Sequence, residues 1–416
     1  MTHFVRDQQS TFGAFPAGIC SLREHLLIRA PADSSILRLF VYSLKGFYMT
    51  TYRAAVIGLG RMGSTFDDEI EQGGAIYLPF CHAPSYHAHP QINLVAGADP
   101  HDEQRALFGQ RWGLSPNHLY TDYRELLKKE KPDIISVTTT ARIRAQIVQD
   151  AVNAGVKAIW AEKPIAISLQ EADSMVNACR QKGVALAVNC SRRYNPYFSQ
   201  TRQMIADGEL GNILQITAYT SCGLSHNGSH AIDTLCYLAG GNITWVFGEM
   251  ESDQKAATDD DLMGNGYLAF DNGIRVYMRG MNTGIASWEF DIIGTKGRVR
   301  LVADTTDAEI IQQIPGSHRG RGIPARLAFP QPARPQGQGI TLISDLIDAL
   351  ENNRPPRCSG DDGRAALEVA IALRESHRKG GTRIFLPIED RTLQILSSET
   401  RGDDVPARVR RLQQTK

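Results

Sequence analysis

Gly58-Leu59-Gly60-Arg61-Met62-Gly63 follows directly on the apolar run Arg53-Ala54-Ala55-Val56-Ile57. The run is typical of a buried strand, and the glycines have the G-x-G-x-x-G spacing that joins such a strand to a helix. The first glycine permits a tight turn, the second lets a pyrophosphate approach the backbone, and the third lets the helix pack closely on the strand. The sequence therefore predicts a Rossmann domain with a dinucleotide at the helix N-terminus. The residues expected to contact this cofactor are Gly58, Gly60, Arg61, Met62 and Gly63.

A second strand at residues 93–98 ends in Asp99, an acid suited to the adenosine ribose hydroxyls. Its carboxylate would repel a 2′-phosphate, so the sequence favours NAD as cofactor, although Arg61 or His101 could soften that repulsion and admit NADP. Titration with both cofactors tests the preference, and tighter binding of NADP would contradict it.

The interval from the glycines to Asp99 is longer than the usual distance of about 20 residues, because residues 64–90 lengthen it. This segment contains Asp67-Asp68-Glu69, Gly73-Gly74, His82, His87 and His89. Its acids and histidines are separated by a glycine break and include no helical ligand pair such as HExxH, so we expect no metal site. We interpret the segment as a lid or rim loop near the cofactor.

Strands and helices continue to alternate as far as residue 190, which predicts a doubly wound parallel sheet. The strand at residues 132–140 ends in hydroxyls, and we expect Thr138 and Thr139 at the cofactor edge. The next strand runs into Glu162-Lys163-Pro164. Because proline cannot donate to a sheet ladder and holds the preceding residue extended, Lys163 is expected at the carboxyl edge of the sheet, where such folds bind ligands. Glu162 and Lys163 are therefore predicted to lie beside the cofactor.

Length, charge and cysteine usage limit the class of protein. The chain has 416 residues, more than one ordinary core holds, and its 45 basic residues balance 45 acidic residues, so nothing in its charge favours nucleic acid or an anionic membrane. No apolar run approaches the roughly 20 residues of a membrane span, and the seven cysteines form no CxxC pair. We expect two domains, a small-molecule partner, reduced thiols and a soluble, cytoplasmic protein.

Four segments are expected along the chain. Residues 49–190 form the Rossmann domain, and residues 191–390 form an α/β domain for substrate binding and oligomerisation. Residues 1–48 fit neither pattern and are interpreted as a dispensable extension, so expression from Met49 should preserve folding and cofactor binding. Residues 391–416 are polar and arginine-bearing, which predicts a solvated tail.

Short strand-like runs separated by turns predict an antiparallel meander in the second domain. These runs lie at residues 245–251, 266–270, 274–279, 288–293 and 299–302. One face of the sheet is expected to pack on helices, which leaves the other face available to a partner subunit.

A helix predicted at residues 226–241 has His226, His230, Asp233 and Tyr237 on one face. An exposed face more often carries lysine and glutamate than two histidines and a tyrosine, so we interpret this face as lining a cleft. Because His230 and Asp233 are one turn apart, the acid could orient the histidine or bind a substrate hydroxyl.

Four motifs, taken in order, resemble the Gfo/Idh/MocA (glucose-fructose oxidoreductase/inositol dehydrogenase) family. They are the glycine motif, Glu162-Lys163-Pro164, Arg192-Arg193-Tyr194-Asn195-Pro196 and Gly228-Ser229-His230-Ala231-Ile232-Asp233, and the resemblance covers residues 53–387. It implies an N-terminal Rossmann domain and a C-terminal α/β domain with a large, mainly antiparallel open sheet that often mediates oligomers, here a homodimer or homotetramer. It also implies an NAD(P)-dependent oxidoreductase acting on a sugar, cyclitol or related polyol, in which the lysine of E-K-P works with a histidine of the second domain.

We expect His230 to be the base that removes the proton of the substrate hydroxyl as hydride leaves carbon. Lys163, its pKa lowered by desolvation, would position the hydroxyl and stabilise the developing alkoxide. Asp233 would orient His230 or bind an adjacent hydroxyl, and His226 would lie at the substrate rim. The predicted substrate-binding residues are Arg193, Tyr194, His226, His230 and Asp233.

Two positions depart from the family pattern. Relatives often show D-x-G-x-H where this chain has His226-Asn227-Gly228-Ser229-His230, so the usual acid is missing, and Arg144 stands where relatives commonly carry histidine. Two other functions stay open: a lyase or glycosidase that uses tightly bound NAD as a transient oxidant, and a non-catalytic dinucleotide-binding sensor. Product formation without net NADH would identify the first, whereas the intact E-K-P motif and His230 argue against the second.

Overall fold

The computed structural model describes residues 50–70, 76–220, 222–280, 288–305, 307–318, 321–332 and 336–396. The expected extension at residues 1–48 lies outside these residues, as do Gly73-Gly74 and residues 397–416 of the expected tail. Among the described helices, none combines the length and the apolar character needed to span a membrane.

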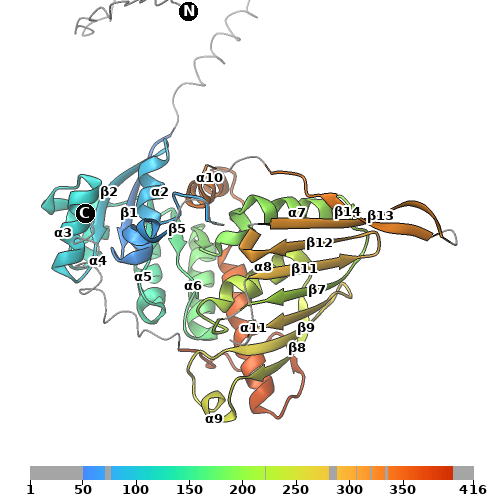
Figure 1. The fold of residues 1–416 in the computed structure, drawn as a ribbon. Helices are drawn as coiled ribbons and strands as arrows, with labels where there is room; N and C mark the ends of the chain where they lie inside the picture. The colour runs from blue at the N-terminus through green and yellow to red at the C-terminus, as the bar shows by residue number, and fades with distance from the viewer. Residues whose placement is uncertain are drawn as a thin grey trace, which may run out of the picture. The chain divides into compact units, whose positions relative to one another are not determined.

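The first sheet has six parallel strands in the order β3-β2-β1-β4-β5-β6 (Figure 1). They are β1 (Tyr52–Ile57), β2 (Ile92–Ala98), β3 (Leu119–Tyr120), β4 (Ile134–Val137), β5 (Ala158–Ala161) and β6 (Ala185–Val188). The strand order reverses between β1 and β4, and open α/β sheets bind ligands at the carboxyl ends of the strands beside such a point. The predicted Rossmann sheet is confirmed.

Helices connect these strands, as predicted. They are α3 (Asp102–Trp112), α4 (Tyr123–Glu130), α5 (Ala141–Asn153) and α6 (Leu169–Lys182). α6 follows the E-K-P motif and begins with a capping interaction, because the Ser168 hydroxyl accepts a hydrogen bond from the Glu171 N–H at 3.2 Å. It ends at Gly183, whose φ of 66° is left-handed and favours glycine.

The described part of residues 64–90 does not form the expected lid or rim loop. It includes helix α2 (His82–Ala88), in which the side chains of His82 and Tyr86 are fully buried while His87 is exposed. His89 hydrogen bonds through Nε2 to Ser344 Oγ at 3.1 Å, which ties the segment to α10 (Gln338–Glu351). The expectation of a loop was wrong for residues 82–88, because they form a helix whose His82 and Tyr86 side chains are buried inside the domain.

The second sheet has nine strands in the order β14-β13-β12-β11-β7-β10-β9-β8-β15 (Figure 1). They are β7 (Ile213–Tyr219), β8 (Ile243–Met250), β9 (Gly264–Phe270), β10 (Arg275–Arg279), β11 (Glu289–Gly294), β12 (Gly297–Val302), β13 (Asp307–His318), β14 (Arg321–Ala328) and β15 (Ile384–Phe385). Among the described strands of this sheet, only β7 and β10 pair in parallel. The large, mainly antiparallel sheet is thus confirmed.

The two faces of this sheet differ in what covers them. Helices α8 (Gly228–Ala239) and α11 (Gly360–Arg378) pack on one face, where Ile216, Val246 and Leu268 are fully buried. On the other face Tyr267 contacts the rings of Trp245 and Tyr277. We call Trp245, Tyr267, Tyr277 and Phe385 the aromatic face; the last two are 42% and 65% exposed.

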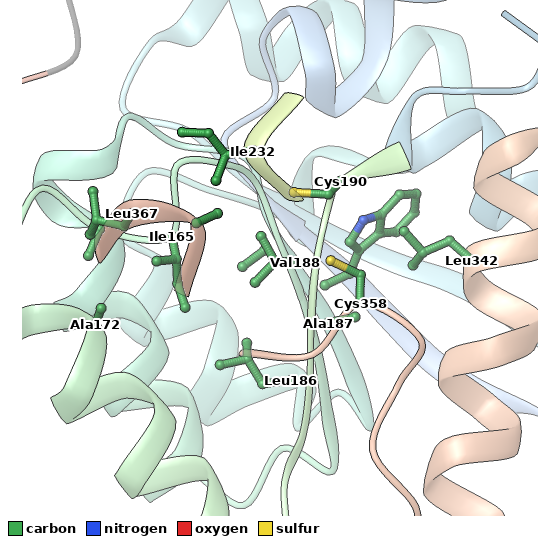
Figure 2. Packing of buried hydrophobic residues seen from close by; sticks show 14 of the residues in the cluster. Ile165, Ala172, Leu186, Ala187, Val188, Cys190, Ile232, Leu342, Cys358 and Leu367 are labelled. Carbon is green, nitrogen blue, oxygen red and sulfur yellow. The ribbon is translucent and has the colours of Figure 1, made fainter. Parts of the chain in front are cut away.

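Apolar packing continues from the first sheet into the helices of the second domain (Figure 2). Leu186 and Val188 of β6 lie in one cluster with Ile232 of α8, Leu342 of α10 and Leu367 of α11, and all five are at most 5% exposed. This shared core fixes the end of β6 relative to α8, which matters because both elements lead into the candidate site.

Residues 391–396, expected to belong to a solvated tail, are instead part of the fold. Ile395 is buried, and its N–H donates to the Ile167 carbonyl at 2.8 Å. The Leu396 N–H donates to the Asp259 carbonyl at 2.7 Å, and the Leu396 carbonyl accepts from the Asp261 N–H at 3.0 Å. Residues 393–396, named the terminal clamp, therefore join the loop after the E-K-P motif to the second domain.

Candidate active site

The E-K-P motif lies at the end of β5, where the Glu162 N–H donates to the Val137 carbonyl of β4 at 3.0 Å. Arg144, on the first turn of α5, is buried beneath this turn and donates to the carbonyls of Pro164 and Thr139. Burial lowers the pKa of Arg144 to about 10, which still leaves it charged at neutral pH. In place of the histidine common in relatives, this arginine joins the ends of two neighbouring strands.

The Glu162 carboxylate, predicted to lie beside the cofactor, faces protein groups. It accepts hydrogen bonds from His82 Nε2 at 3.1 Å, Asn189 Nδ2 at 2.6 Å and the Lys163 N–H at 3.2 Å, and it is 4% exposed. Burial alone would raise the pKa of Glu162, but the hydrogen bond from His82 and the nearby charges lower it to about 2. An ionised carboxylate therefore lies directly beneath Lys163.

The sequence analysis placed His82 in a lid or rim loop, but the structure buries its side chain inside the domain. Its ring stacks on Trp160 with centroids 3.6 Å apart, and its Nδ1 lies 2.8 Å from Ser136 Oγ. Burial lowers the pKa of His82, so the ring is neutral and donates through Nε2 to Glu162. His82 thus holds the buried Glu162 carboxylate next to Lys163. It belongs to the segment at residues 64–90, which lengthens the interval between the glycine motif and Asp99.

Lys163 reaches the second domain. Its side chain is partly exposed, and Nζ donates to Asn227 Oδ1 at 3.3 Å. Asn227 precedes α8 and lies between His226 and the helix that carries His230. Burial lowers the pKa of Lys163, while the Glu162 carboxylate opposes that shift. The structure therefore brings the lysine of one domain to the histidine-bearing loop of the other.

His230 is positioned by the first turn of α8, where its N–H donates to the Asn227 carbonyl at 3.1 Å. Its Nδ1 is buried and has no hydrogen-bond partner among the described residues. Burial, together with the positive charges of Lys163 and Arg192, lowers the pKa of His230 well below its usual value. The imidazole is therefore neutral at pH 7, the state that a general base requires.

Asp261 supports the loop that carries the two histidines. Its carboxylate accepts from the N–H of Ser225 at 2.8 Å and of His226 at 2.7 Å. Sequence reasoning missed this acid because it comes 35 positions after His226. The loop lacks the usual acid at position 226, and the Asp261 carboxylate holds the backbone N–H groups of this loop.

Asp233 requires a correction, because it neither orients His230 nor faces the cleft. It is 1% exposed, and both carboxylate oxygens accept from the Arg193 guanidinium, the shortest contact being 2.8 Å. Cys358 Sγ lies 3.7 Å from the same carboxylate. The predicted polar face of the helix is in fact divided: His230 is partly exposed, and Asp233 lies inside the protein.

Arg193 and Tyr194, predicted to bind substrate, are also used internally. Arg193 donates to Asp233, to Asp362 at 3.0 Å and to the Arg357 carbonyl at 2.7 Å. The Tyr194 hydroxyl donates to Asp345 at 3.1 Å. Both side chains are at most 7% exposed and join the start of the second domain to α8, α10 and α11.

The glycine motif has the geometry that a dinucleotide needs. Gly58 has a φ of 95°, and a Cβ on Gly63 would lie 2.2 Å from the Gly58 carbonyl oxygen, so both positions require glycine for internal reasons. A Cβ on Gly60 would meet no atom within 4 Å. The second glycine therefore faces open space, where the motif is expected to receive the pyrophosphate.

The other predicted cofactor residues surround this turn. Asp99 directly follows β2, and its carboxylate accepts from the Leu59 N–H at 2.9 Å and from the His101 N–H at 3.0 Å. Arg61 makes a two-point ion pair with Glu69, both contacts being 2.8 Å, so its charge is already neutralised. Thr138 donates to the Ile57 carbonyl at 3.1 Å and so braces the turn, whereas Thr139 and Met62 are partly exposed beside it.

Sequence comparison identifies both halves of the chain. Residues 52–190 match the model of an oxidoreductase family with an NAD-binding Rossmann fold, and residues 202–385 match the C-terminal alpha/beta domain of that family. D-apiose dehydrogenase from Paraburkholderia graminis is 25% identical over 79% of this chain and 93% of its own. Myo-inositol 2-dehydrogenase from Thermotoga maritima is 21% identical over 78% of this chain and 96% of its own.

Structural comparison agrees with this assignment. An inositol dehydrogenase homologue from Azotobacter vinelandii, solved with NADH and myo-inositol, superposes with a TM-score of 0.65 at 19% identity, covering 81% of this chain and 98% of the other. The two family models together cover both sheets and the loops that carry Lys163 and His230. The chain is a member of the Gfo/Idh/MocA oxidoreductase family.

Proposed function

We propose that the protein is an NAD-dependent dehydrogenase that transfers hydride between nicotinamide and a secondary alcohol or ketone of a sugar, cyclitol or related polyol. One observation carries the proposal: Lys163 at the strand edge beside the glycine turn donates across the domains to Asn227, next to His226 and one turn from His230. The relatives named for apiose and inositol support the class of substrate.

The side chains suit the proton chemistry of such a reaction. The nicotinamide, when bound, supplies the hydride acceptor. Neutral His230 accepts the proton of the substrate hydroxyl, and Lys163 donates a hydrogen bond to the same oxygen as negative charge develops on it. Glu162 beneath Lys163 favours the charged form of the lysine, which keeps it a donor. Asp233, Arg193 and Tyr194 act on this chemistry only through the packing of α8.

Asp99 favours NAD over NADP in this proposal. Its carboxylate is fixed at the end of β2 by two backbone N–H groups, and Arg61, which could have balanced a 2′-phosphate, is paired with Glu69. A carboxylate at this position binds ribose hydroxyls and repels a phosphate.

A direct spectrophotometric assay tests the proposed function. The purified protein is incubated with NAD or NADP and a panel of inositols, aldoses and aldonic acids, and reduced cofactor is followed by absorbance. We expect NADH to accumulate in step with oxidised product, with a higher kcat/KM for NAD than for NADP. Product without net NADH would instead identify the lyase or glycosidase, and cofactor binding without any product would identify the sensor.

We infer that the aromatic face joins two copies of the chain, giving a homodimer or homotetramer. Exposed, clustered aromatic side chains mark interaction sites, and four of them lie on four neighbouring strands. Light scattering should give a mass of two or four chains, and Tyr277→Glu should lower it. Ile143→Glu, at an isolated side chain that is 52% exposed on α5, is the matched control. A parent protein that is monomeric at assay concentration would contradict the inference.

We place the protein in a reducing, cytoplasmic compartment. The six cysteines among the described residues are all free thiols, which is usual where disulfides do not persist. Thiol titration in denaturant without reductant should find every cysteine reduced, and a disulfide-bonded pair would count against this placement.

A further inference from the structure

The Glu162 carboxylate has two cations in its neighbourhood and forms an ion pair with neither. Burial lowers the pKa of both Lys163 and Arg144, and the charge of Glu162 is the next influence on each and raises both. Among the described residues, however, the carboxylate contacts neither side-chain cation, and Arg144 donates to the carbonyls of Pro164 and Thr139. A buried carboxylate is usually paired with a cation, so its separation from these two requires a cause.

Uncharged donors bind the carboxylate instead. His82 Nε2 and Asn189 Nδ2 both donate to Oε1, at 3.1 and 2.6 Å, and the Lys163 backbone N–H donates to Oε2 at 3.2 Å. We call His82 and Asn189 the carboxylate cradle. Because both oxygens have donors, Glu162 needs no charged side chain to satisfy its hydrogen bonds.

The sheet holds His82 in one orientation. Its neutral ring donates through Nε2, so Nδ1 accepts the hydroxyl proton of Ser136, whose Oγ lies 2.8 Å away. The ring also stacks on Trp160, and Ser136 and Trp160 are paired residues of β4 and β5. The histidine is therefore fixed to the strand that leads into the E-K-P motif and to its neighbour.

Asn189 is fixed from the opposite side. It follows β6, its backbone N–H donates to the Ala161 carbonyl at 2.8 Å, and it is 3% exposed. β6 is the other neighbour of β5. The two side chains of the cradle thus reach Glu162 from the strands on either side of the strand that carries it.

This arrangement leaves the side chain of Lys163 free of the carboxylate. Nζ extends to Asn227 Oδ1 at 3.3 Å, and the side chain is partly exposed whereas Glu162 is 4% exposed. A hydrogen bond needs contact, but Coulomb attraction falls off only gradually with distance. A carboxylate held out of contact therefore still favours the charged lysine without occupying its N–H donors. The other groups that face Lys163 are Arg144, His230 and the thiols of Cys190 and Cys222.

We propose that His82, together with Asn189, is a positioning residue for the reaction: it withholds the Glu162 carboxylate from Nζ of Lys163, so that the lysine stays charged and yet free to bind the substrate oxygen. It acts on catalysis only through Glu162. The proposal rests on the proposed dehydrogenase function. When the His82 donor is removed, the carboxylate turns to Nζ and draws it away from the substrate.

Two substitutions of His82 separate its N–H donor from its ring. His82→Phe keeps the ring and its stacking but loses the donor, whereas His82→Gln keeps an N–H donor and loses the ring. We expect His82→Phe to lower kcat on the best polyol of the panel about 10- to 100-fold, with KM for NAD unchanged, and His82→Gln to recover most of this loss. Parent turnover in His82→Phe, or a larger loss in His82→Gln than in His82→Phe, would assign the residue to packing and overturn the proposal.

The alkaline limb of the pH profile reports where the carboxylate goes. A carboxylate in contact with Nζ favours the charged lysine and raises its pKa, so His82→Phe should move the limb to higher pH. Glu162→Gln removes the negative charge and should move the limb to lower pH. A shift to lower pH in His82→Phe would mean that the carboxylate had turned to Arg144 or become protonated, and would overturn the proposal.

A double variant tests whether His82 acts only through Glu162. Added to Glu162→Gln, His82→Phe should lower kcat no further, because the charge that it released is absent. A loss that multiplies the two single effects would show an independent role for His82 and would reject the proposal. If His82→Phe does not fold, Asn189→Leu removes the other side-chain donor and should shift kcat and the alkaline limb in the same directions.

His89→Phe is the matched control, since it makes the same substitution at a buried histidine seven residues later. His89 is 5% exposed and contacts Ser344 of α10 at 3.1 Å, away from Glu162. Folded His89→Phe should keep the kcat and the alkaline limb of the parent. Equal effects of the two substitutions would show that His82→Phe acts through general loss of packing and would overturn the proposal.

Acetylation of Lys163 tests the cradle without turnover. Each protein is treated with acetic anhydride across the alkaline pH range, and modification of Lys163 is measured by mass spectrometry against exposed Lys128. The midpoint for Lys163 should lie at higher pH in His82→Phe, near the parent value in His82→Gln and at lower pH in Glu162→Gln. If the parent oxidises no polyol, these midpoints still support the cradle while the dehydrogenase proposal fails. Coinciding midpoints in His82→Phe and parent would reject the cradle whatever the protein turns over.

Discussion

His230→Ala and Lys163→Ala are each expected to lower kcat on an identified polyol by about 10²–10⁴, the usual contribution of a positioned acid or base. Binding of NAD should change little, because neither side chain contacts the glycine turn that Gly58 and Gly63 form. The measurement is steady-state turnover together with an NADH titration of each variant. His118→Ala is the matched control, since this histidine lies outside the cleft and loses only a surface ion pair with Glu130.

The pH profile separates the two roles. His230 must be unprotonated to accept a proton, and its lowered pKa moves the acid limb of kcat/KM below the usual histidine value of about 6.5. Lys163 must be protonated to donate, and its lowered pKa moves the alkaline limb below about 10.4. His230→Ala should remove the acid limb and keep the alkaline limb. If His230→Ala kept near-parent turnover, the base would be Lys163 or His226.

Asp233→Ala is expected to destabilise the protein strongly while leaving the chemistry of the folded fraction close to that of the parent. Removing one partner of a buried ion pair leaves the other charge without compensation, and such changes cost about 3–5 kcal/mol. Arg193 would be the affected charge, since it is 7% exposed, loses its two-point contact and keeps a carboxylate contact only with Asp362, at 3.0 Å. Urea unfolding of parent and variant measures the free-energy difference.

An exposed aspartate provides the comparison for this variant. Asp361→Ala breaks the pair with Arg180, whose side chains are 49% and 59% exposed, and should cost at most about 1 kcal/mol. The kcat of folded Asp233→Ala protein should lie within a few-fold of the parent. A variant of parent stability that has lost more than about tenfold in kcat would show that Asp233 acts on substrate or on His230 after all.

Features that depend on residues close together in the sequence could be predicted. The glycine turn and the lysine at the end of β5 follow from local rules, because a tight turn needs Gly58 and a proline ends the ladder after Lys163. The helix cap at Ser168 is of the same kind. In each case the interacting groups lie within a few positions of one another, so their spacing determines the geometry.

Asp233 could not be assigned correctly, because its partner comes from another element. Helical periodicity correctly put Asp233 one turn from His230, but Arg193, 40 positions earlier, takes both carboxylate oxygens. The same limit applies to Glu162, which is bound by His82 from 80 positions earlier. A pattern of one helix shows which side chains share a face and does not show which neighbour covers that face.

The turn at Ala303, Asp304 and Thr305 illustrates a third limit. Nothing in the sequence around Asp304 suggests a turn of three left-handed residues, because Ala303 and Thr305 both favour other conformations. Contacts from Arg192 and Asn195 help to hold this backbone. The signal available from the sequence was the pair of arginines after β6, which bind different carboxylates, Arg193 that of Asp233 and Arg192 that of Asp304.

The terminal clamp has a consequence for how the cleft can move. Its backbone N–H and carbonyl groups hydrogen bond both to Ile167, four residues after Lys163, and to the backbone of Asp259 and Asp261. The Asp261 carboxylate in turn holds the histidine loop. A hinge motion that opened the domains would have to break hydrogen bonds on one side of this short segment. Substrate exchange is therefore expected to occur by local movement at the mouth of the cleft, and the spacing between lysine and imidazole is maintained between successive catalytic cycles.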